Sequence, residues 1–196
     1  MDSKLLRVSI DLPEWMGEAV GSASVEWPDD LVRMDLVLAL ARRNVEEATG
    51  GPFAAAVFES ASGALVAAGL NVVVPSAVSI AHAEIVAIAI ACRAVGSYDL
   101  GAPGLPAMEL VTTTEPCAMC FGAVPWSGVR RLVCGARDED ATAVGFDEGA
   151  KPVSWVAALE SRGIEVVRDV RRSEGAELLA DYASAGGVIY NGRRGD

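Results

Sequence analysis

The stretch SIAHAEIVAIAIA, residues 79–91, decides the fold of this chain. It reads as a buried helix, yet it carries His82, the single histidine of the sequence, and a glutamate two residues further on. After one loop and one predicted strand, the segment EPCAMC at residues 115–120 adds Cys117 and Cys120. Catalytic zinc sites typically use three protein ligands and leave the fourth position to water. The two segments therefore predict one catalytic zinc ion per subunit, held by the histidine and the two cysteines.

The local setting of these residues suits zinc chemistry. Pro116 fits the first turn of a short helix, and Cys117 and Cys120, three residues apart, then direct both sulfurs to one side. A helix N-terminus also favours the thiolate form of a cysteine. Zinc lowers the pKa of its bound water to about 7. We expect attack by zinc hydroxide, with Glu84 as the proton shuttle, because an apolar pocket raises the pKa of a carboxyl group.

Three other interpretations each explain one part of this pattern. A lone histidine in an apolar helix is commonly a core residue whose ring nitrogens are satisfied. A C-x-x-C pair can be a redox pair, and Cys134 could supply a fourth sulfur that closes a structural zinc site. Each leaves the other parts of the pattern unexplained, so a catalytic site is our interpretation. We expect Cys92 and Cys134 to be small, buried, apolar residues.

The order of the predicted elements indicates the fold class. Apolar periodicity and turn signals predict helices near residues 29–48, 82–96, 117 onward, 138–144, 154–161 and 173–184, and strands at 53–60, 63–71, 108–114, 129–136 and 164–168. Such alternation produces a sheet covered on both faces. We expect an α/β fold with three α/β/α layers and a central mixed sheet of about five strands flanked by helices. Residues 1–28, interrupted by prolines and glycines, are expected to be an irregular N-terminal extension.

Composition narrows the class of partner. The chain has 196 residues, 52% of them hydrophobic, and a net charge of −11; its mean hydropathy is +0.33. No apolar run approaches the roughly 20 residues of a membrane span, and the start lacks a basic segment followed by an apolar block. The acidic balance disfavours a polynucleotide partner. We expect a soluble, cytoplasmic protein that acts on a small molecule, with neither a nucleic acid nor a membrane as partner.

The spacing H-x-E…P-C-x-x-C resembles the signature of the cytidine-deaminase-like superfamily of zinc deaminases. Three further segments, GGPFAAAVF at 50–58, GLNVVVPS at 69–76 and GFDEG at 145–149, are similar to the bacterial guanine deaminases of that superfamily. The resemblance implies that residues 29–196 form a single zinc-dependent deaminase domain. It also implies a C-terminal segment, about 186–196, that covers the pocket and is often exchanged between the subunits of a homodimer.

The resemblance also implies roles for residues outside the zinc motif. Asn71 corresponds to an asparagine that reads the edge of a purine, since its amide both donates and accepts. Glu148 corresponds to a second acid that handles the departing amino group, although Asp147 stands one place before it. The remaining implied substrate-binding residues are Phe53, Ala83, Trp126, Phe146 and Tyr190, of which Phe53, Trp126 and Phe146 would be walls for a flat ring.

The function implied is conversion of guanine and water to xanthine and ammonia, in purine catabolism. Guanosine, pterins and amino-triazines such as ammeline are the nearest alternative substrates. A tRNA adenosine, cytosine-type or DNA deaminase is a further alternative, which would require a basic groove. A zinc-stabilised domain without enzymatic activity is the alternative from another class. Pocket shape decides among the ring substrates.

Overall fold

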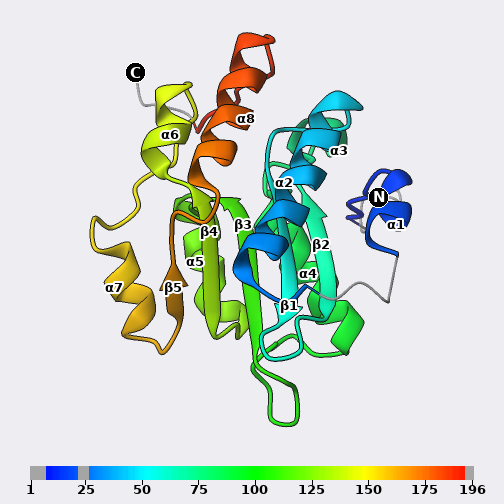
Figure 1. Cartoon of the computed structure of the whole chain (residues 1–196), viewed down its shortest axis with the longest axis vertical. Coiled ribbons are helices and arrows are strands. Elements are labelled where there is room, and N and C mark those ends of the chain that lie inside the picture. The colour runs from blue at the N-terminus through cyan, green and yellow to red at the C-terminus, as the bar shows by residue number, and fades with distance from the viewer. Residues whose placement is uncertain (1–7, 22–26, 193–196) are drawn as a thin grey trace, which may run out of the picture.

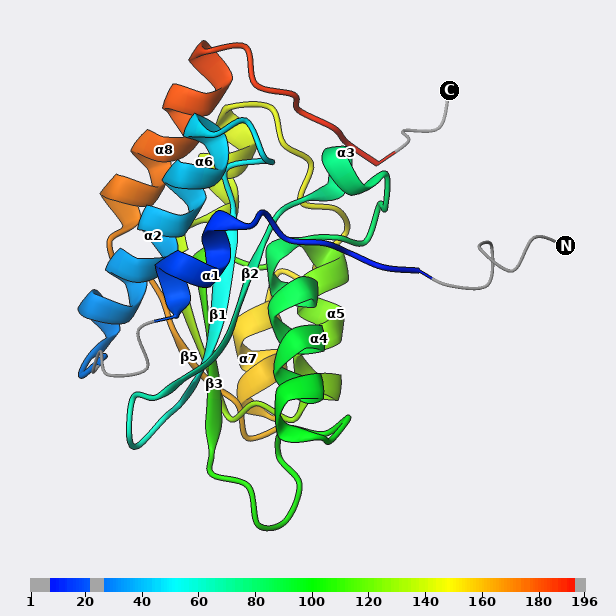
Figure 2. The ribbon, with the colours of Figure 1, turned by 90° about the vertical axis from the view of Figure 1, so that its right-hand side faces the viewer.

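A five-stranded sheet lies between two layers of helices in the computed structural model of this chain, which describes residues 8–21 and 27–192 (Figures 1 and 2). The strands are β1 Ala54–Glu59, β2 Leu65–Leu70, β3 Met108–Thr114, β4 Arg131–Ala136 and β5 Glu165–Val167. The helices are α1 Trp15–Val20, α2 Asp30–Glu46, α3 Val73–Ser76, α4 Ala83–Val95, α5 Ala118–Ser127, α6 Asp138–Ala143, α7 Trp155–Glu160 and α8 Arg172–Ser184. In this described part of the chain, every helix is too short or too polar to cross a membrane.

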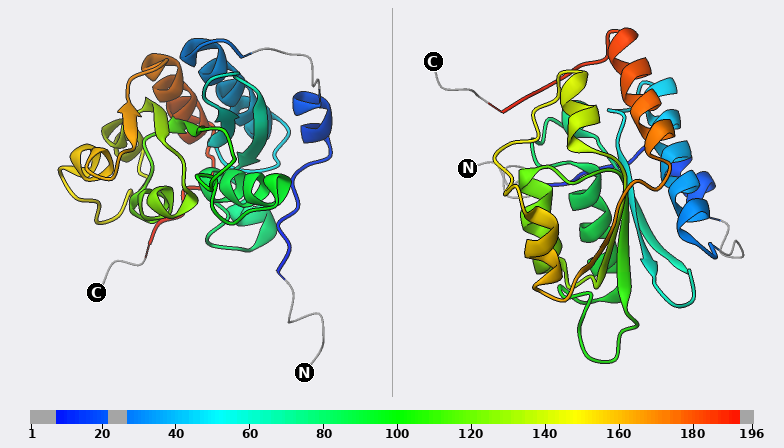
Figure 3. Two further views of the ribbon diagram at one scale, coloured as in Figure 1. Left: turned by 90° about the horizontal axis from the view of Figure 1, so that it is seen from below. Right: turned by 60° about the vertical axis from the view of Figure 1, so that its left-hand side comes forward.

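The sheet is mixed, which confirms the predicted fold class. Its strand order is β2-β1-β3-β4-β5, with β1 antiparallel to both of its neighbours. Strands β3, β4 and β5 run parallel to one another. Helices α2 and α8 cover one face, and α4, α5 and α7 cover the other (Figures 2 and 3). A separate hydrophobic cluster therefore lies between each face of the sheet and the helices that cover it.

Two short helices depart from the sequence-based expectation. Helix α1 lies in the extension that we expected to be irregular, and α3 lies in an expected loop. Helix α1 is held by packing, because Met16 is buried and the guanidinium of Arg43 stacks over the Trp15 ring at 4.7 Å. Pro75 is the third residue of α3, where a missing N–H removes no intrahelical hydrogen bond. Residues 1–7 and 22–26 of the expected extension lie outside the described residues.

The topology brings distant parts of the sequence to one edge of the sheet. Strand β3 ends at Thr114 on this edge, and β1, which runs the other way, begins there directly after Phe53. Strand β2 ends there one residue before Asn71. Helices α4 and α5 begin at the same edge, with His82 and Cys117 as their N-cap residues.

Helix α4 packs directly on the backbone of β2 at Gly69. A Cβ atom at this position would lie 2.4 Å from both the carbonyl oxygen of Ala83 and the backbone nitrogen of Ala87. No real side chain tolerates such distances to backbone atoms, so only glycine permits the observed approach. This contact fixes the first turn of α4 against the strand that ends before Asn71.

We expect Gly69→Ala to destabilise the protein by about 1–3 kcal/mol, because the methyl group forces α4 off the sheet. Thermal unfolding followed by circular dichroism measures the effect. Gly17→Ala is the matched control, since a Cβ atom there meets nothing within 4 Å. Equal melting temperatures for the two variants would show that the close packing at Gly69 is not needed.

Candidate active site

Three potential metal ligands meet at the start of α4 and α5. The Nδ1 atom of His82 lies 3.6 Å from the Sγ atoms of both Cys117 and Cys120, and all three ligand atoms are within 4.8 Å of one another. Zinc–nitrogen and zinc–sulfur bonds of about 2.0 and 2.3 Å at a tetrahedral angle separate the two ligand atoms by about 3.5 Å, close to the observed distances. The residues therefore fit a zinc ion and leave a fourth position toward the cavity.

The electrostatics of the cluster favour a metal cation. The N-termini of α4 and α5 both point at the cysteines, and their partial positive charge stabilises a thiolate. The Cys120 thiol donates to the Cys117 sulfur and lowers the pKa of Cys117 to about 4. For the same reason the pKa of Cys120 is raised. The sulfur pair thus holds negative charge at neutral pH.

The other two cysteines stand apart from this cluster. Cys134 is fully buried in β4, as predicted, and burial raises the pKa of its thiol. Within the described residues, the group able to hold a metal contains His82 and the cysteine pair but not Cys134, so the closed structural site lacks its fourth sulfur. Cys92 is only half-buried, and its thiol donates to the carbonyl of Tyr98 at 3.6 Å.

Glu84 lies beside the cluster in the first turn of α4. Its side chain is 7% exposed and lines the cavity in front of the ligands. Burial raises the pKa of this carboxyl group, and the nearby Cys117 thiolate raises it further. A carboxyl group in such surroundings can both accept and donate a proton near neutral pH.

The cavity itself is small, about 40 Å³. The predicted site residues that line it, besides His82 and Cys117, are Phe53, Asn71, Glu84, Phe146, Glu148 and Tyr190. The rings of Phe53 and Phe146 meet edge to face, with centroids 4.9 Å apart, and form an aromatic wall. These residues come from five separate parts of the chain, which the topology gathers at one sheet edge.

Asn71 directly follows the last residue of β2 and is held there by hydrogen bonds. It is 3% exposed, and its backbone carbonyl accepts a hydrogen bond of 3.1 Å from the side-chain amide of Asn44. The same amide donates to the carbonyl of Gly51 at 2.8 Å. Asn44, fully buried on α2, was missed by sequence reasoning. The available signal was a polar residue on the apolar face of a helix, six residues before the Gly50-Gly51 pair.

Tyr190 fills the space in front of Asn71. The Nδ2 atom of Asn71 donates to the Tyr190 hydroxyl at 2.6 Å, and that hydroxyl lies 3.4 Å from Nε2 of His82. The C-terminal segment therefore reaches the cavity of its own chain, while exchange between subunits stays a prediction. Residues 193–196 of the predicted covering segment lie outside the described part.

The loop at residues 145–149 presents Glu148 to the cavity. The carbonyl of Glu148 accepts the Ala118 N–H at 2.8 Å, which ties the loop to the start of α5. Burial raises the pKa of the Glu148 carboxyl to about 8, and the Cys117 thiolate contributes. Asp147 also lines the cavity, but its carboxylate accepts the Gly149 N–H at 2.9 Å within the turn.

Two predicted substrate-binding residues lie elsewhere. Trp126 is 86% exposed and does not line the cavity. Helix α5 buries Cys120 and Val124, and the phase of the helix turns Trp126 to the opposite, outer face. The Ala83 side chain is buried in the cluster between α4 and the sheet, because this residue faces the strands rather than the cavity.

Comparisons with known proteins agree with this geometry. Residues 28–136 match the model of the cytidine and deoxycytidylate deaminase zinc-binding region. Guanine deaminase of Bacillus subtilis is 38% identical over 109 residues, covering 56% of this chain and 65% of that enzyme's length. The structure of a guanine deaminase from Nitrosomonas europaea is 49% identical with a TM-score of 0.86, over 94% of this chain and 98% of the other. A solved structure in complex with 2,6-diaminopurine is 51% identical with a TM-score of 0.89, over 95% and 98% of the two chains.

We expect Cys117→Ser to lose most of its bound zinc, because a serine oxygen is a poorer zinc ligand than a thiolate. Metal analysis of the purified protein by atomic absorption gives the stoichiometry. Cys134→Ala is the control and is expected to keep one zinc per chain. Loss of zinc from Cys134→Ala but not from Cys117→Ser would instead support a structural zinc site in which Cys134 is a ligand.

Proposed function

Since this chain belongs to the cytidine and deoxycytidylate deaminase zinc-binding family, we propose that it is a hydrolytic deaminase that converts guanine and water to xanthine and ammonia. The observation that carries the proposal is the cavity, which brings the buried Glu84, the half-buried Glu148 and an aromatic wall to the candidate zinc ligands. The near 50% identity to a guanine deaminase over almost the whole chain supports guanine as the substrate.

Two residues of this chain would move protons in the reaction. Bound zinc activates water as a nucleophile at neutral pH. Glu84, in contact with the cavity and buried among apolar residues, would take the proton of the attacking water and deliver it to a ring nitrogen. Glu148, whose pKa of about 8 keeps it protonated at neutral pH, would donate to the amino group as ammonia leaves.

Recognition of the ring would fall to Asn71 and the aromatic wall. The Asn71 amide offers one donor and one acceptor side, which match adjacent polar atoms on a purine edge. The Nδ2 atom of Asn71 already donates to the Tyr190 hydroxyl. A ligand that accepts from this atom would therefore displace the hydroxyl, not a water molecule. Phe53 and Phe146 would stack against or border the flat ring.

A homodimer is part of this proposal. Three apolar side chains on or next to the outer faces of α4 and α5 are exposed: Ile80 by 52%, Met119 by 37% and Trp126 by 86%. A second copy of the chain would cover such a surface. The proposal also places the enzyme in the cytoplasm, in purine catabolism, where free guanine is released.

We expect zinc-loaded protein to release ammonia from guanine faster than from guanosine, ammeline, pterins or cytosine. Glu84→Gln should lower kcat by about 100-fold or more, because the shuttle contributes that much, while zinc content stays unchanged. Glutamate dehydrogenase-coupled ammonia detection gives the rates. Another ring leading the panel would refute guanine as the substrate, and turnover of tRNA with none of the free bases would favour the polynucleotide alternative.

The pH dependence of kcat tests the role of Glu148. An acid with a pKa of about 8 donates its proton below that pH, so kcat is expected to hold near neutrality and to fall as pH rises through about 8. Glu148→Gln should be slow at all pH values and lack this limb. A wild-type profile that keeps rising above pH 9 would contradict the assignment.

A further inference from the structure

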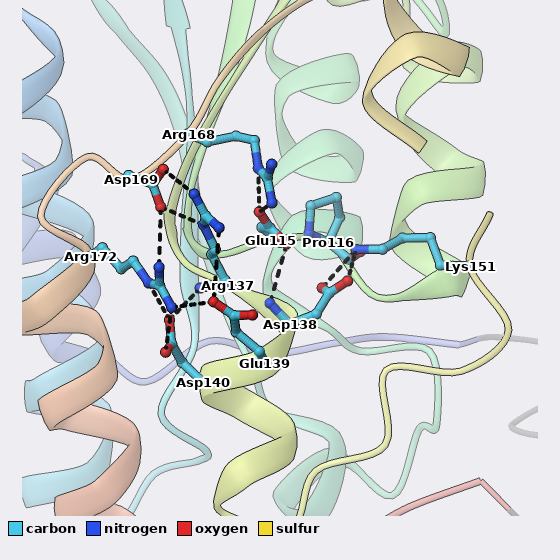
Figure 4. A network of polar contacts seen from close by, with 10 residues as sticks. All are labelled: Glu115, Pro116, Arg137, Asp138, Glu139, Asp140, Lys151, Arg168, Asp169 and Arg172. Atoms are coloured by element: carbon cyan, nitrogen blue, oxygen red, sulfur yellow. Dashed lines mark hydrogen bonds and ion pairs between the residues drawn. The ribbon is translucent and has the colours of Figure 1, made fainter. Parts of the chain in front are cut away.

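Lys151 has surroundings that are unusual for a lysine. It follows the loop that carries Glu148, and its side chain is only 5% exposed. Its ammonium group donates to the carbonyl oxygen of Pro116 at 2.8 Å and to the carboxylate of Asp138 at 2.6 Å (Figure 4). The Trp155 ring lies below the ammonium at 4.4 Å. Lysine is rarely buried unless it is paired, so these contacts account for its position.

The hydrogen bond from Lys151 to Pro116 connects the loop that carries Glu148 with the segment that carries Cys117. Pro116 precedes the zinc ligand Cys117, and Lys151 stands three residues after Glu148. On the other side, the Ala118 N–H donates to the Glu148 carbonyl. The loop with Glu148 is thus attached to the ligand segment at two points, one at Glu148 itself and one through Lys151.

The Asp138 carboxylate is in turn fixed to the sheet. The Asp138 N–H donates to Glu115 at 3.2 Å, and Glu115, 3% exposed, pairs with Arg168 beside β5 (Figure 4). Arg137 and Arg172 extend the ion pairs at the exposed side of this network through Asp169 and Asp140. Lys151 therefore connects the loop that carries Glu148 to the ion-paired network of Asp138, Glu115 and Arg168.

We propose that Lys151 is a positioning residue for Glu148, which it holds at a fixed place relative to the zinc ligands by binding the Pro116 carbonyl. The proposal rests on the proposed function in that Glu148 is the acid for the leaving group. A methionine would fill the same space over Trp155 without binding Pro116. The lysine nitrogen is therefore the part that supplies the link.

The test compares Lys151→Met with Arg137→Met. Both remove one cation from the same network, but Arg137 makes no contact with Pro116 or with the loop in the described structure. A misplacement of about 1 Å can cost about 100-fold in rate. We expect Lys151→Met to lower kcat by about 10- to 100-fold with KM within about threefold and zinc content unchanged, and Arg137→Met to match wild type.

Hydrogen–deuterium exchange gives a readout that does not depend on the substrate. Peptides covering residues 145–151 and the Ala118 amide should exchange faster in Lys151→Met than in Arg137→Met. Asp138→Asn, which keeps the Pro116 contact but weakens the anchor of Lys151, should give a smaller change of the same kind and serves if Lys151→Met does not fold.

The outcomes separate this proposal from the function. A lower melting temperature for Lys151→Met with wild-type kcat and wild-type exchange would overturn the positioning role and leave a purely stabilising ion pair. If wild-type protein releases no ammonia from guanine, the proposed substrate fails. Faster exchange of residues 145–151 would then still support the link through Lys151, and unchanged exchange would overturn it.

Discussion

The approach of α4 to β2 at Gly69 is the constraint on which the site depends. The strand leads directly to Asn71, and the helix begins with His82 and Glu84. Because the two elements touch through backbone atoms, the distance from His82 to Asn71 is set without adjustable side chains between the helix and the strand. The cysteine segment follows β3, and two hydrogen bonds, from Ala118 to Glu148 and from Lys151 to Pro116, join it to the loop that carries Glu148.

The buried and half-buried glutamates around β3 and the cavity follow two different patterns. Glu109 near the start of β3 pairs with Arg33 and Arg131, and Glu115 past its end pairs with Arg168. In the described part of the chain, Glu84 and Glu148 make no ion pair, and burial raises the pKa of both. Ion-paired carboxylates thus lie at both ends of the central strand, whereas Glu84 and Glu148 line the cavity without an ion pair in the described residues.

The sequence predicted what depends on short-range pattern. Motifs of a few residues indicate the candidate zinc ligands and Glu84, and they indicate the pairing of the first two strands. The order of the predicted elements indicates the mixed sheet. Lys151 could not be found this way, because its partner is the backbone carbonyl of Pro116, 35 residues earlier in the chain. The direction of Trp126 could not be predicted for a related reason: the resemblance gave its position in the chain, but the packing of α5 decides which way its side chain points.

The hydrogen bond between Asn71 and Tyr190 has a consequence for affinity. The Tyr190 hydroxyl already occupies the Asn71 amide, so any ligand that binds this amide competes with the phenol of the same chain. Its apparent dissociation constant is the intrinsic one divided by the fraction of molecules in which the phenol has withdrawn. The affinity of the pocket for such a ligand therefore depends on Tyr190 near the C-terminus, whose hydroxyl also lies 3.4 Å from Nε2 of His82.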